Sequence, residues 1–424
     1  MDSKLRWWAV NAQFFARRAM DLVIDAQSGF RIIVLNGPRQ SGKSTLMKAL
    51  ADQAAALVTL DDRIALRAAR TDPAGFVGGY GYPLLIDEVQ RGGDPLVLAI
   101  KAVVDRDDRP GQFVLAGSSR FLTVPTLSES LAGRARIIDL WPLSQGELSG
   151  GRDGLIDRLF DPPADLRALD VAAMNRRAMM ERVVLGGFPA VHRMPASLRR
   201  DWFEDYRRTL VQRDLAELRQ LRRLNEVPRL LRLAAERTAQ EVNLTSYAGA
   251  LGLTVDTTRD YLALLEVIYV HQLLPGWTSG LTSRASRRPK LHIVDSGLAA
   301  DTLGASVDTL AAPTSTLAGP LLETFVVGEL TRQRTWSRVR PDLYHFRDRD
   351  RREVDVVVEA RDGRVAAVEV KAAVDVDESD TRWLVYLRDR LGDRFVNGVV
   401  LHLGDRPRPL GDRLTALPIA ALWS

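Results

Sequence analysis

Short runs of consecutive apolar residues alternate with helical patterns over the first 140 or so positions of the chain. Five such runs predict buried strands: 31–36 (RIIVLN), 56–60 (ALVTL), 83–87 (PLLID), 112–116 (QFVLA) and 136–141 (RIIDLW). Strands that alternate with helices are typical of a parallel, doubly wound sheet. We therefore expect an α/β domain with a parallel sheet over residues 1–150.

A stretch rich in Gly, Asp and Pro, 149–166, ends this pattern, and the chain then has helical periodicity to about residue 275. Within it, a helix over 244–251, a tight turn at Gly252 and a second helix over 256–265 precede the strand-like run VIYVHQLL. That order is typical of a winged helix-turn-helix. We expect a helical domain with a winged helix over residues 165–290.

The last part of the chain, 291–424, again mixes strands with helices. Strands are predicted at 291–294, 343–346, 353–359, 365–370 and 397–402, and helices around 320–334 and 379–391. This pattern predicts a second α/β domain.

Composition narrows the chemistry. The 424 residues include no cysteine, which excludes disulfides, thiolate zinc sites and cysteine nucleophiles, and the five histidines form no HExxH motif. The net charge of +5 is compatible with nucleic acid as a partner but does not require it. The start of the chain lacks a signal-peptide pattern, and the apolar stretch 261–274 is too short to span a bilayer. We expect a cytoplasmic protein without a membrane partner.

A glycine-bearing loop lies between the first predicted strand and the next helix. It reads GPRQSGKST, comprising Gly37, Pro38, Arg39, Gln40, Ser41, Gly42, Lys43, Ser44 and Thr45, and fits GxxxxGK[ST]. Glycines let backbone N–H groups point at phosphate oxygens, and the following helix N-terminus favours anions. Lys43 would reach the β- and γ-phosphates of ATP, and Ser44 would supply a hydroxyl to Mg²⁺.

A second acidic element completes this site. The strand 83–87 ends in Asp87 and is followed by Glu88. Asp87 would lie beside the metal, and Glu88 would act as general base on the attacking water. Both halves occur in order on alternating strands, which predicts an ATP- and Mg²⁺-dependent hydrolase.

Two further side chains are candidates for contact with the γ-phosphate. Ser118 follows the strand 112–116 and either senses phosphate or caps the next helix. Arg134, or less favourably Arg136, would place a guanidinium on the γ-phosphate, either within the chain or from a neighbouring copy in a homo-oligomer.

The ordered series GPRQSGKS, LVTLDD, PLLIDEVQ, VLAGSSR and SLAGRARIIDLWPLSQGEL resembles a group of bacterial and archaeal AAA-type P-loop ATPases. In that family a C-terminal domain of unknown function, with winged-helix and nuclease-like parts, follows the ATPase domain. GGFPAVHR, LHIVDSGLA and GPLLETFVVGEL resemble that C-terminal region. The resemblance implies ATP binding and hydrolysis.

Four C-terminal residues have the arrangement of PD-(D/E)XK nucleases: Glu323 on a predicted helix, Asp355 on a strand, then Glu369 and Lys371. Alternation along a strand places Glu369 and Lys371 on one face. The carboxylates would hold a second divalent metal, Mg²⁺ or Mn²⁺, and Lys371 would activate water. The alternative is an amphipathic strand pair with a solvated Glu–Lys contact. We expect a restriction-endonuclease-like fold whose chemistry is open.

The winged helix also allows two interpretations. Thr257, Thr258, Arg259 and Tyr261 would read a groove of DNA or RNA. The small, polar and basic segment 276–290 is expected to be a loop or wing, which would bring Arg284, Arg287, Arg288 and Lys290 to phosphates. Alternatively, the winged helix is an interaction module that packs on the ATPase domain or on another subunit. The leading hypothesis is thus an ATPase coupled to a nucleic-acid-binding or nuclease-like module. The alternative is a nucleotide-dependent switch or scaffold with a non-catalytic nuclease-like fold.

Overall fold

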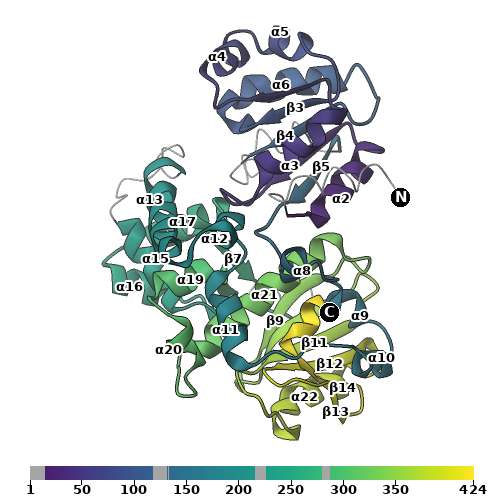
Figure 1. The fold of residues 1–424 in the computed structure, drawn as a ribbon, viewed down its shortest axis with the longest axis vertical. Helices are drawn as coiled ribbons and strands as arrows, with labels where there is room; N and C mark the ends of the chain where they lie inside the picture. Colours follow the sequence, from purple (N-terminus) through teal and green to yellow (C-terminus); the bar gives the residue numbers. More distant parts are fainter. Residues whose placement is uncertain (1–14, 118–130, 132, 215–225, 279–286) are drawn as a thin grey trace. The chain divides into compact units, whose positions relative to one another are not determined.

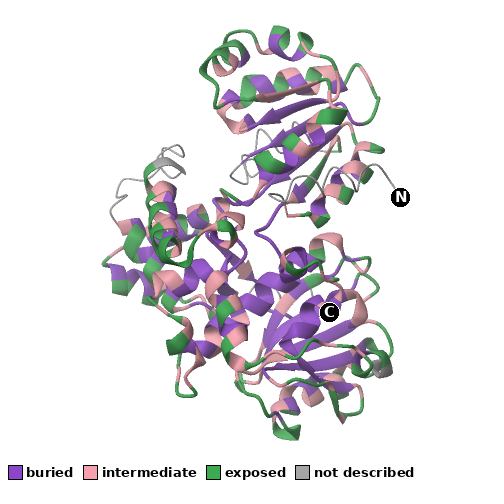
Figure 2. Ribbon diagram, viewed as in Figure 1, coloured by how far each residue is buried: buried purple, intermediate pink, exposed green. Residues whose placement is uncertain are grey.

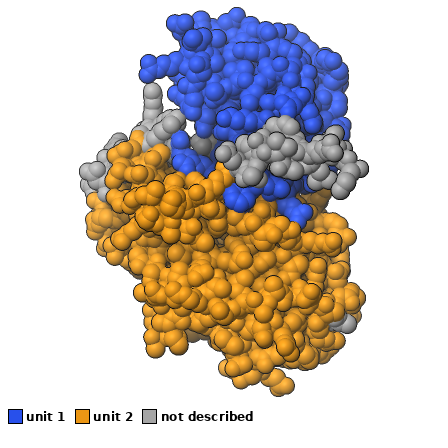
Figure 3. All heavy atoms as spheres, in the orientation of Figure 1, with its two compact units in different colours: residues 1–143, 267–269 blue, residues 144–266, 270–424 orange. Residues whose placement is uncertain are grey.

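The computed structural model describes residues 15–117, 131, 133–214, 226–278 and 287–424. It divides into two compact units, residues 1–143 with 267–269 and residues 144–266 with 270–424 (Figure 3). The three expected domains, 1–150, 165–290 and 291–424, stay a prediction. The boundary expected after residue 290 falls inside a strand, β8 (Lys290–Ile293).

Unit 1 is built on a five-stranded parallel sheet (Figure 1). Its order is β2-β3-β4-β1-β5. The strands are β1 (Ile32–Asn36), β2 (Ala56–Thr59), β3 (Leu84–Asp87), β4 (Phe113–Ala116) and β5 (Ala135–Asp139). The five apolar runs therefore do form parallel strands, as predicted.

Alternation along β1 explains why this sheet needs helices on both faces. Ile32 and Val34 belong to one apolar cluster, and Ile33 and Leu35 belong to the other. The first cluster includes side chains of α4 (Arg63–Thr71), α5 (Pro73–Gly78) and α6 (Gly93–Val104), and the second includes those of α2 (Arg18–Gln27) and α3 (Lys43–Leu50). A strand buried on both faces is typical of a parallel sheet.

Unit 2 contains a helical part and two sheets. The helices before the first strand of its small sheet are α8 (Gln145–Ser149), α9 (Leu155–Arg158), α10 (Pro163–Arg167), α11 (Arg176–Leu185), α12 (Pro189–Arg193), α13 (Arg199–Thr209) and α15 (Val227–Glu236). The small sheet is antiparallel, with the order β6-β8-β7, where β6 is Gln240–Glu241 and β7 is His271–Leu274. Two helices, α16 (Leu244–Leu251) and α17 (Val255–Val267), lie between β6 and β7 in the chain.

The second sheet of unit 2 has six strands in the order β13-β14-β12-β11-β10-β9. Its strands are β9 (Asp342–Arg347), β10 (Glu353–Glu359), β11 (Val365–Val370), β12 (Phe395–His402), β13 (Arg408–Gly411) and β14 (Leu414–Pro418). Sequence patterning predicts the first four of these and misses β13 and β14. The helices after β8 are α19 (Ser296–Thr302), α20 (Val307–Ala311), α21 (Ala318–Trp336) and α22 (Arg382–Leu391).

The apolar core of this sheet packs under α22, through Leu384 and Leu387. Its central strands are buried, as are those of unit 1 (Figure 2). The long helix α21 packs against β8 and β11 and is buried over much of its length. This placement brings polar residues of α21 into the interior of unit 2. Within the described residues, no helix is long and apolar enough to cross a membrane.

Candidate functional site

The loop between β1 and α3 depends on two glycines. Gly37 has φ of 150°, and a Cβ there would lie 2.2 Å from the carbonyl oxygen of Leu140. Gly42 precedes α3 with φ of 100°, in the left-handed region that favours glycine. Ser41 lies buried in the loop, and its hydroxyl has no hydrogen-bond partner among the residues that the structure describes. A tight loop with a spare buried polar atom, leading into a helix N-terminus, fits a phosphate group.

Lys43 lies inside this loop with 5% of its surface exposed. Its Nζ donates hydrogen bonds to the carbonyl oxygens of Gly37 at 2.8 Å and Pro38 at 2.7 Å. Ser44 and Thr45 follow on the first turn of α3 and are exposed. The loop thus holds an ammonium group close to its backbone while the hydroxyl groups face solvent.

The acidic element lies at the same edge of the sheet. β3 ends at Asp87, which is buried, and Glu88 follows with φ of 54°. The Nε2 of Gln90 donates a hydrogen bond to Oε2 of Glu88 at 2.5 Å. β4 lies between β3 and β1 and is parallel to both. The carboxyl ends of these strands therefore meet at one edge, with Asp87 and Glu88 on the same edge as the loop of Lys43.

Arg17 is a residue of this region that no motif indicates. Its Nη1 donates to the carbonyl oxygen of Ser41 at 2.6 Å and its Nη2 to that of Trp141 at 2.7 Å. Arg17 therefore ties the glycine loop to the segment after β5. In an arginine-rich chain, nothing in the local sequence distinguishes it. Gln90, unlike Arg17, could be found from the sequence, because it lies only two residues after Glu88, whose carboxylate it contacts.

Arg134 lies at the opposite edge of the sheet from the loop. β1 and β5 run parallel, with Ile32 opposite Ala135 and Asn36 opposite Asp139. The glycine loop follows Asn36, whereas Arg134 precedes Ala135. A strand of this length spans about 16 Å, so Arg134 does not reach the loop of its own chain.

The side chain of Arg134 forms a hydrogen-bonded ion pair with Asp105, and this hydrogen bond lowers the pKa of that carboxyl group. Arg136, in β5, is exposed. Ser118 lies outside the described residues.

In unit 2, Glu323 of α21 and Asp355 of β10 lie close together, as the nuclease-like arrangement requires. However, both contact the ammonium of Lys290. The Nζ of Lys290 lies 2.8 Å from Oε1 of Glu323, 2.7 Å from Oε1 of Glu353 and 3.3 Å from Oδ1 of Asp355. Lys290 is 1% exposed. The prediction that Lys290 contacts phosphates from a wing is therefore wrong, because three carboxylates surround it in the interior.

These contacts change the protonation of the cluster. Burial alone would lower the pKa of Lys290, but the charges of Glu323, Asp355 and Glu353 outweigh it and raise the pKa. Burial, reinforced by the charge of Asp355, raises the pKa of Glu323 well above its ordinary value. Lys290 therefore stays a cation, and Glu323 binds its proton more tightly than a solvated carboxyl group.

The other two candidate nuclease residues pair with each other. Lys371 Nζ lies 3.0 Å from Oε1 of Glu369, and Asp380 follows at 3.7 Å. Burial and the charge of Asp355 raise the pKa of Glu369 to about 8. The second oxygen of Asp355 accepts a hydrogen bond from the backbone N–H of Val370 at 2.9 Å.

The expected second metal does not fit these residues. No group of three or more His, Asp or Glu side chains among the described residues is arranged to hold a metal ion. The ammonium of Lys290 takes the central position among Glu323, Glu353 and Asp355, where a divalent cation would otherwise lie. Lys290 therefore already supplies a positive charge to these carboxylates from within the chain.

Two of the four expected base-reading residues on α17 belong to the core. Thr258 and Tyr261 are buried, whereas Arg259 is exposed and forms an ion pair with Asp256. Asp260 is exposed as well. The exposed start of α17 therefore carries carboxylates, which repel a phosphate backbone. Of the expected wing residues, Arg284 lies outside the described residues.

Glu329 of α21 is a completely buried carboxyl group whose pKa burial raises to about 7, although Arg332 and the N–H of Gln145 oppose the shift. Its folded-state pKa exceeds the unfolded value, so its contribution to stability is complete below about pH 4.5 and is lost as the pH rises through 7. The contribution amounts to about 3 kcal/mol. We expect the stability of the wild type relative to Glu329→Gln to fall by about that amount from pH 4.5 to pH 8.5.

Urea denaturation of the two proteins at both pH values measures this difference. Glu181→Gln, at an exposed position on α11, is the control and should show little change. A pH-independent difference for Glu329→Gln would contradict the assignment.

Three families of known proteins match separate parts of the chain. Residues 29–149 match the AAA domain family, 176–309 a domain of unknown function (DUF8612), and 318–422 another domain of unknown function (DUF4143). An uncharacterized protein of Mycobacterium tuberculosis is 29% identical over 391 residues, which cover 91% of this chain and 80% of the relative. An uncharacterized protein of Mycobacterium bovis shows the same values.

Two solved structures are similar over part of the chain. A RuvB variant of Thermotoga maritima is 18% identical, with a TM-score of 0.29, covering 60% of this chain and 87% of that one. A DNA polymerase III gamma subunit-related protein of the same organism is 12% identical, with a TM-score of 0.23, covering 59% and 95%. Scores this low carry no argument about fold. The family matches are informative instead. They show that the chain joins an AAA-type P-loop domain to two C-terminal domains of unknown function.

Proposed function

We propose that the chain binds ATP with Mg²⁺ at residues 37–45 and hydrolyses it. One observation carries this proposal. The loop of Lys43 and the carboxylates of Asp87 and Glu88 lie at one edge of a parallel sheet, with β4 between their strands. This arrangement supports a site in which Lys43 would meet the phosphates of ATP and Glu88 would meet the attacking water.

Each residue then has a distinct role. Lys43 binds the β- and γ-phosphates, and the N–H groups of the loop 37–42 and the start of α3 bind phosphate oxygens. Ser44 and Asp87 would hold Mg²⁺, which neutralises phosphate charge. Glu88 orients the attacking water and accepts its proton. Gln90 positions the carboxylate of Glu88 through the 2.5 Å hydrogen bond.

Ser118 and Arg134 belong to this proposal in different ways. Ser118 follows β4, so its position in the chain suits contact with the γ-phosphate. Arg134 suits a role in a neighbouring copy, because the length of a strand, about 16 Å, separates it from the loop of its own chain. The Asp105 carboxylate would release it when copies assemble around ATP.

This assignment predicts that turnover per chain rises with protein concentration. Arg134→Ala should lower ATP hydrolysis at least tenfold without changing ATP affinity, because it removes a charge from the transition state only. A mixture of Arg134→Ala and Glu88→Gln should recover part of the activity, since each variant supplies what the other lacks. Arg136→Ala is the matched control. Concentration-independent turnover, or a mixture as inactive as its components, would contradict a role in the neighbouring copy.

For unit 2 we propose a module that binds a protein partner and responds to the nucleotide, with winged-helix and nuclease-like folds but no cleavage chemistry. The winged helix is supported by the order α15, β6, α16, α17, β7, β8 and the antiparallel sheet β6-β8-β7. The nuclease-like fold is supported by α21 followed by β9, β10, β11, α22 and β12. The absence of cleavage is supported by Lys290, whose ammonium lies among Glu323, Glu353 and Asp355 at the position that a metal ion would need.

Nucleic-acid binding is the second candidate for this unit. The chain's net charge of +5 and the exposed Arg288 before β8 favour it. The acidic start of α17 opposes it, because Asp256 and Asp260 would face the phosphates. This balance of charges favours a protein partner.

A further inference from the structure

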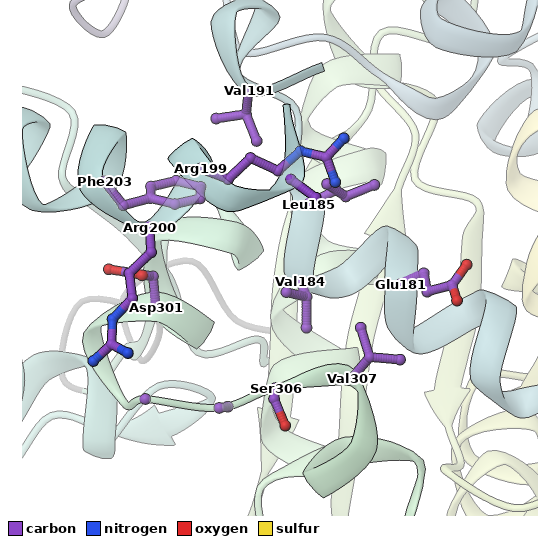
Figure 4. A pocket seen from close by; sticks show the side chains of 13 residues that line it. Glu181, Val184, Leu185, Val191, Arg199, Arg200, Phe203, Asp301, Ser306 and Val307 are labelled. Carbon is purple, nitrogen blue, oxygen red and sulfur yellow. The ribbon is translucent and has the colours of Figure 1, made fainter. Parts of the chain in front are cut away.

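A pocket in the helical part of unit 2 combines apolar walls with arginines. It has a volume of about 540 Å³ and lies among α11, α12, α13 and the segment that joins α19 to α20 (Figure 4). Val184, Leu185, Val191, Phe203 and Val307 supply apolar side chains to its lining. This volume is within the range of small-molecule sites. Its lining includes none of the residues assigned above to ATP and none of Lys290, Glu323, Glu353 and Asp355.

The acidic residues of the lining have ion-pair partners, whereas its arginines have none among the described residues. Asp301 forms an ion pair with Arg207, which does not line the pocket, and Glu181 lies 3.9 Å from Arg177, which does not line it either. Asp301 is therefore paired from outside the pocket, whereas Glu181 is exposed and has only this distant contact, because Arg177 pairs with Asp308 at 2.6 Å. The arginines of the lining, Arg199 and Arg200, have no such partner among the described carboxylates.

These arginines keep donors available for a ligand. Arg199 uses only its Nε, which donates to the carbonyl oxygen of Met194 at 3.3 Å, and its Nη atoms make no hydrogen bond among the described residues. Arg200 makes neither a hydrogen bond nor an ion pair with any residue that the structure describes. Figure 4 shows the guanidinium of Arg199 beside Leu185, above the apolar side chains, and Arg200 on the side of Asp301. A half-buried guanidinium next to an apolar wall is a site for an anionic head on an apolar body.

We propose that this pocket binds a small amphipathic anion, a carboxylate or phosphate monoester attached to an acyl or aryl body. Arg199 binds the head with its Nη atoms, and Val184, Leu185 and Phe203 cover the body. Arg200, at an exposed position, attracts the anion and contributes less to its retention. The site is independent of the proposed ATPase activity.

Binding of decanoate and decyl phosphate to the purified full chain without nucleotide tests this proposal, with decanol and decylammonium as neutral and cationic counterparts. Calorimetric titration should give saturable binding of one or both anions and weaker binding of the counterparts. Decanoate alone or decyl phosphate alone identifies which head the site accepts. Arg199→Gln should weaken anion binding about tenfold or more and leave decanol unaffected, because it removes the charge but little apolar surface.

Arg208→Gln is the matched control, since Arg208 lies on the same helix but pairs with Glu204 and Asp205 outside the pocket. Val184→Glu, which adds a carboxylate to the wall, should abolish anion binding and improve that of decylammonium. Thermal denaturation of each variant checks folding. Equal binding of decanoate and decylammonium, or anion binding that Arg199→Gln and Val184→Glu leave unchanged, would overturn the proposal.

Discussion

Replacing Lys43 with alanine is expected to weaken ATP binding by at least about 100-fold, or roughly 2.7 kcal/mol. The ammonium of Lys43 is 5% exposed and held by the carbonyl oxygens of its own loop, so it lies ready for phosphate charge. Charged hydrogen bonds in such a dry site contribute more than those in water. Titration with ATP and Mg²⁺, followed calorimetrically, measures the change.

Lys48→Ala provides the control for this experiment. Lys48 lies on the same helix, α3, but is exposed near its end. It should leave the Kd for ATP within about threefold of the wild type, since a solvated charge at this distance is screened. Equal ATP affinity of Lys43→Ala and wild type would contradict the nucleotide site.

Replacing Lys290 with methionine is expected to destabilise unit 2 by about 3–5 kcal/mol near neutral pH. Methionine preserves most of the side-chain volume but removes the cation among Glu323, Glu353 and Asp355. Buried carboxylates without a partner carry a large desolvation cost. The loss should shrink as the pH falls, because protonation of Glu323, whose pKa is already raised, removes part of the repulsion.

Urea denaturation at pH 5 and pH 8 measures both effects. Lys371→Met is the matched control, because Lys371 is one third exposed, and its loss should cost less. A Lys290→Met variant as stable as Lys371→Met at pH 8 would contradict the role of Lys290.

The same cluster gives a test against the metal hypothesis. In the smaller variant Lys290→Ala, the carboxylates lose their cation and gain space, so Mn²⁺ should raise its melting temperature. The melting temperature of the wild type should show no such rise, since the ammonium of Lys290 already lies among these carboxylates. Stabilisation of the wild type by Mn²⁺ to the same extent would instead restore the prediction of a second metal.

Local sequence was a good guide to unit 1 because its features are local. Consecutive apolar residues form β1, β3 and β4, and the glycine loop follows β1 directly. The order of strands on the sheet then brings Lys43 and Asp87 to one edge. Position along a strand also decides the case of Arg134, which precedes β5 and therefore lies at the other edge.

The predictions from the sequence were wrong for residues whose contact partners are distant in the chain. Lys290 ends a small, basic segment that reads as a loop, but its partners Glu323 and Asp355 follow 33 and 65 residues later. No local pattern distinguishes a lysine that enters a core from one that faces solvent. Likewise, helical periodicity alone did not show that Thr258 and Tyr261 face the interior of unit 2.

ATP hydrolysis by wild type and Glu88→Gln, both saturated with ATP and Mg²⁺, tests the central proposal most directly. The amide cannot accept a proton from water, whereas Lys43 and the loop remain intact for binding. We expect Glu88→Gln to bind ATP with a wild-type Kd and to release phosphate at least about 100 times more slowly. Phosphate release by Glu88→Gln at the wild-type rate, or none by either protein in any oligomeric state, would contradict the proposed function.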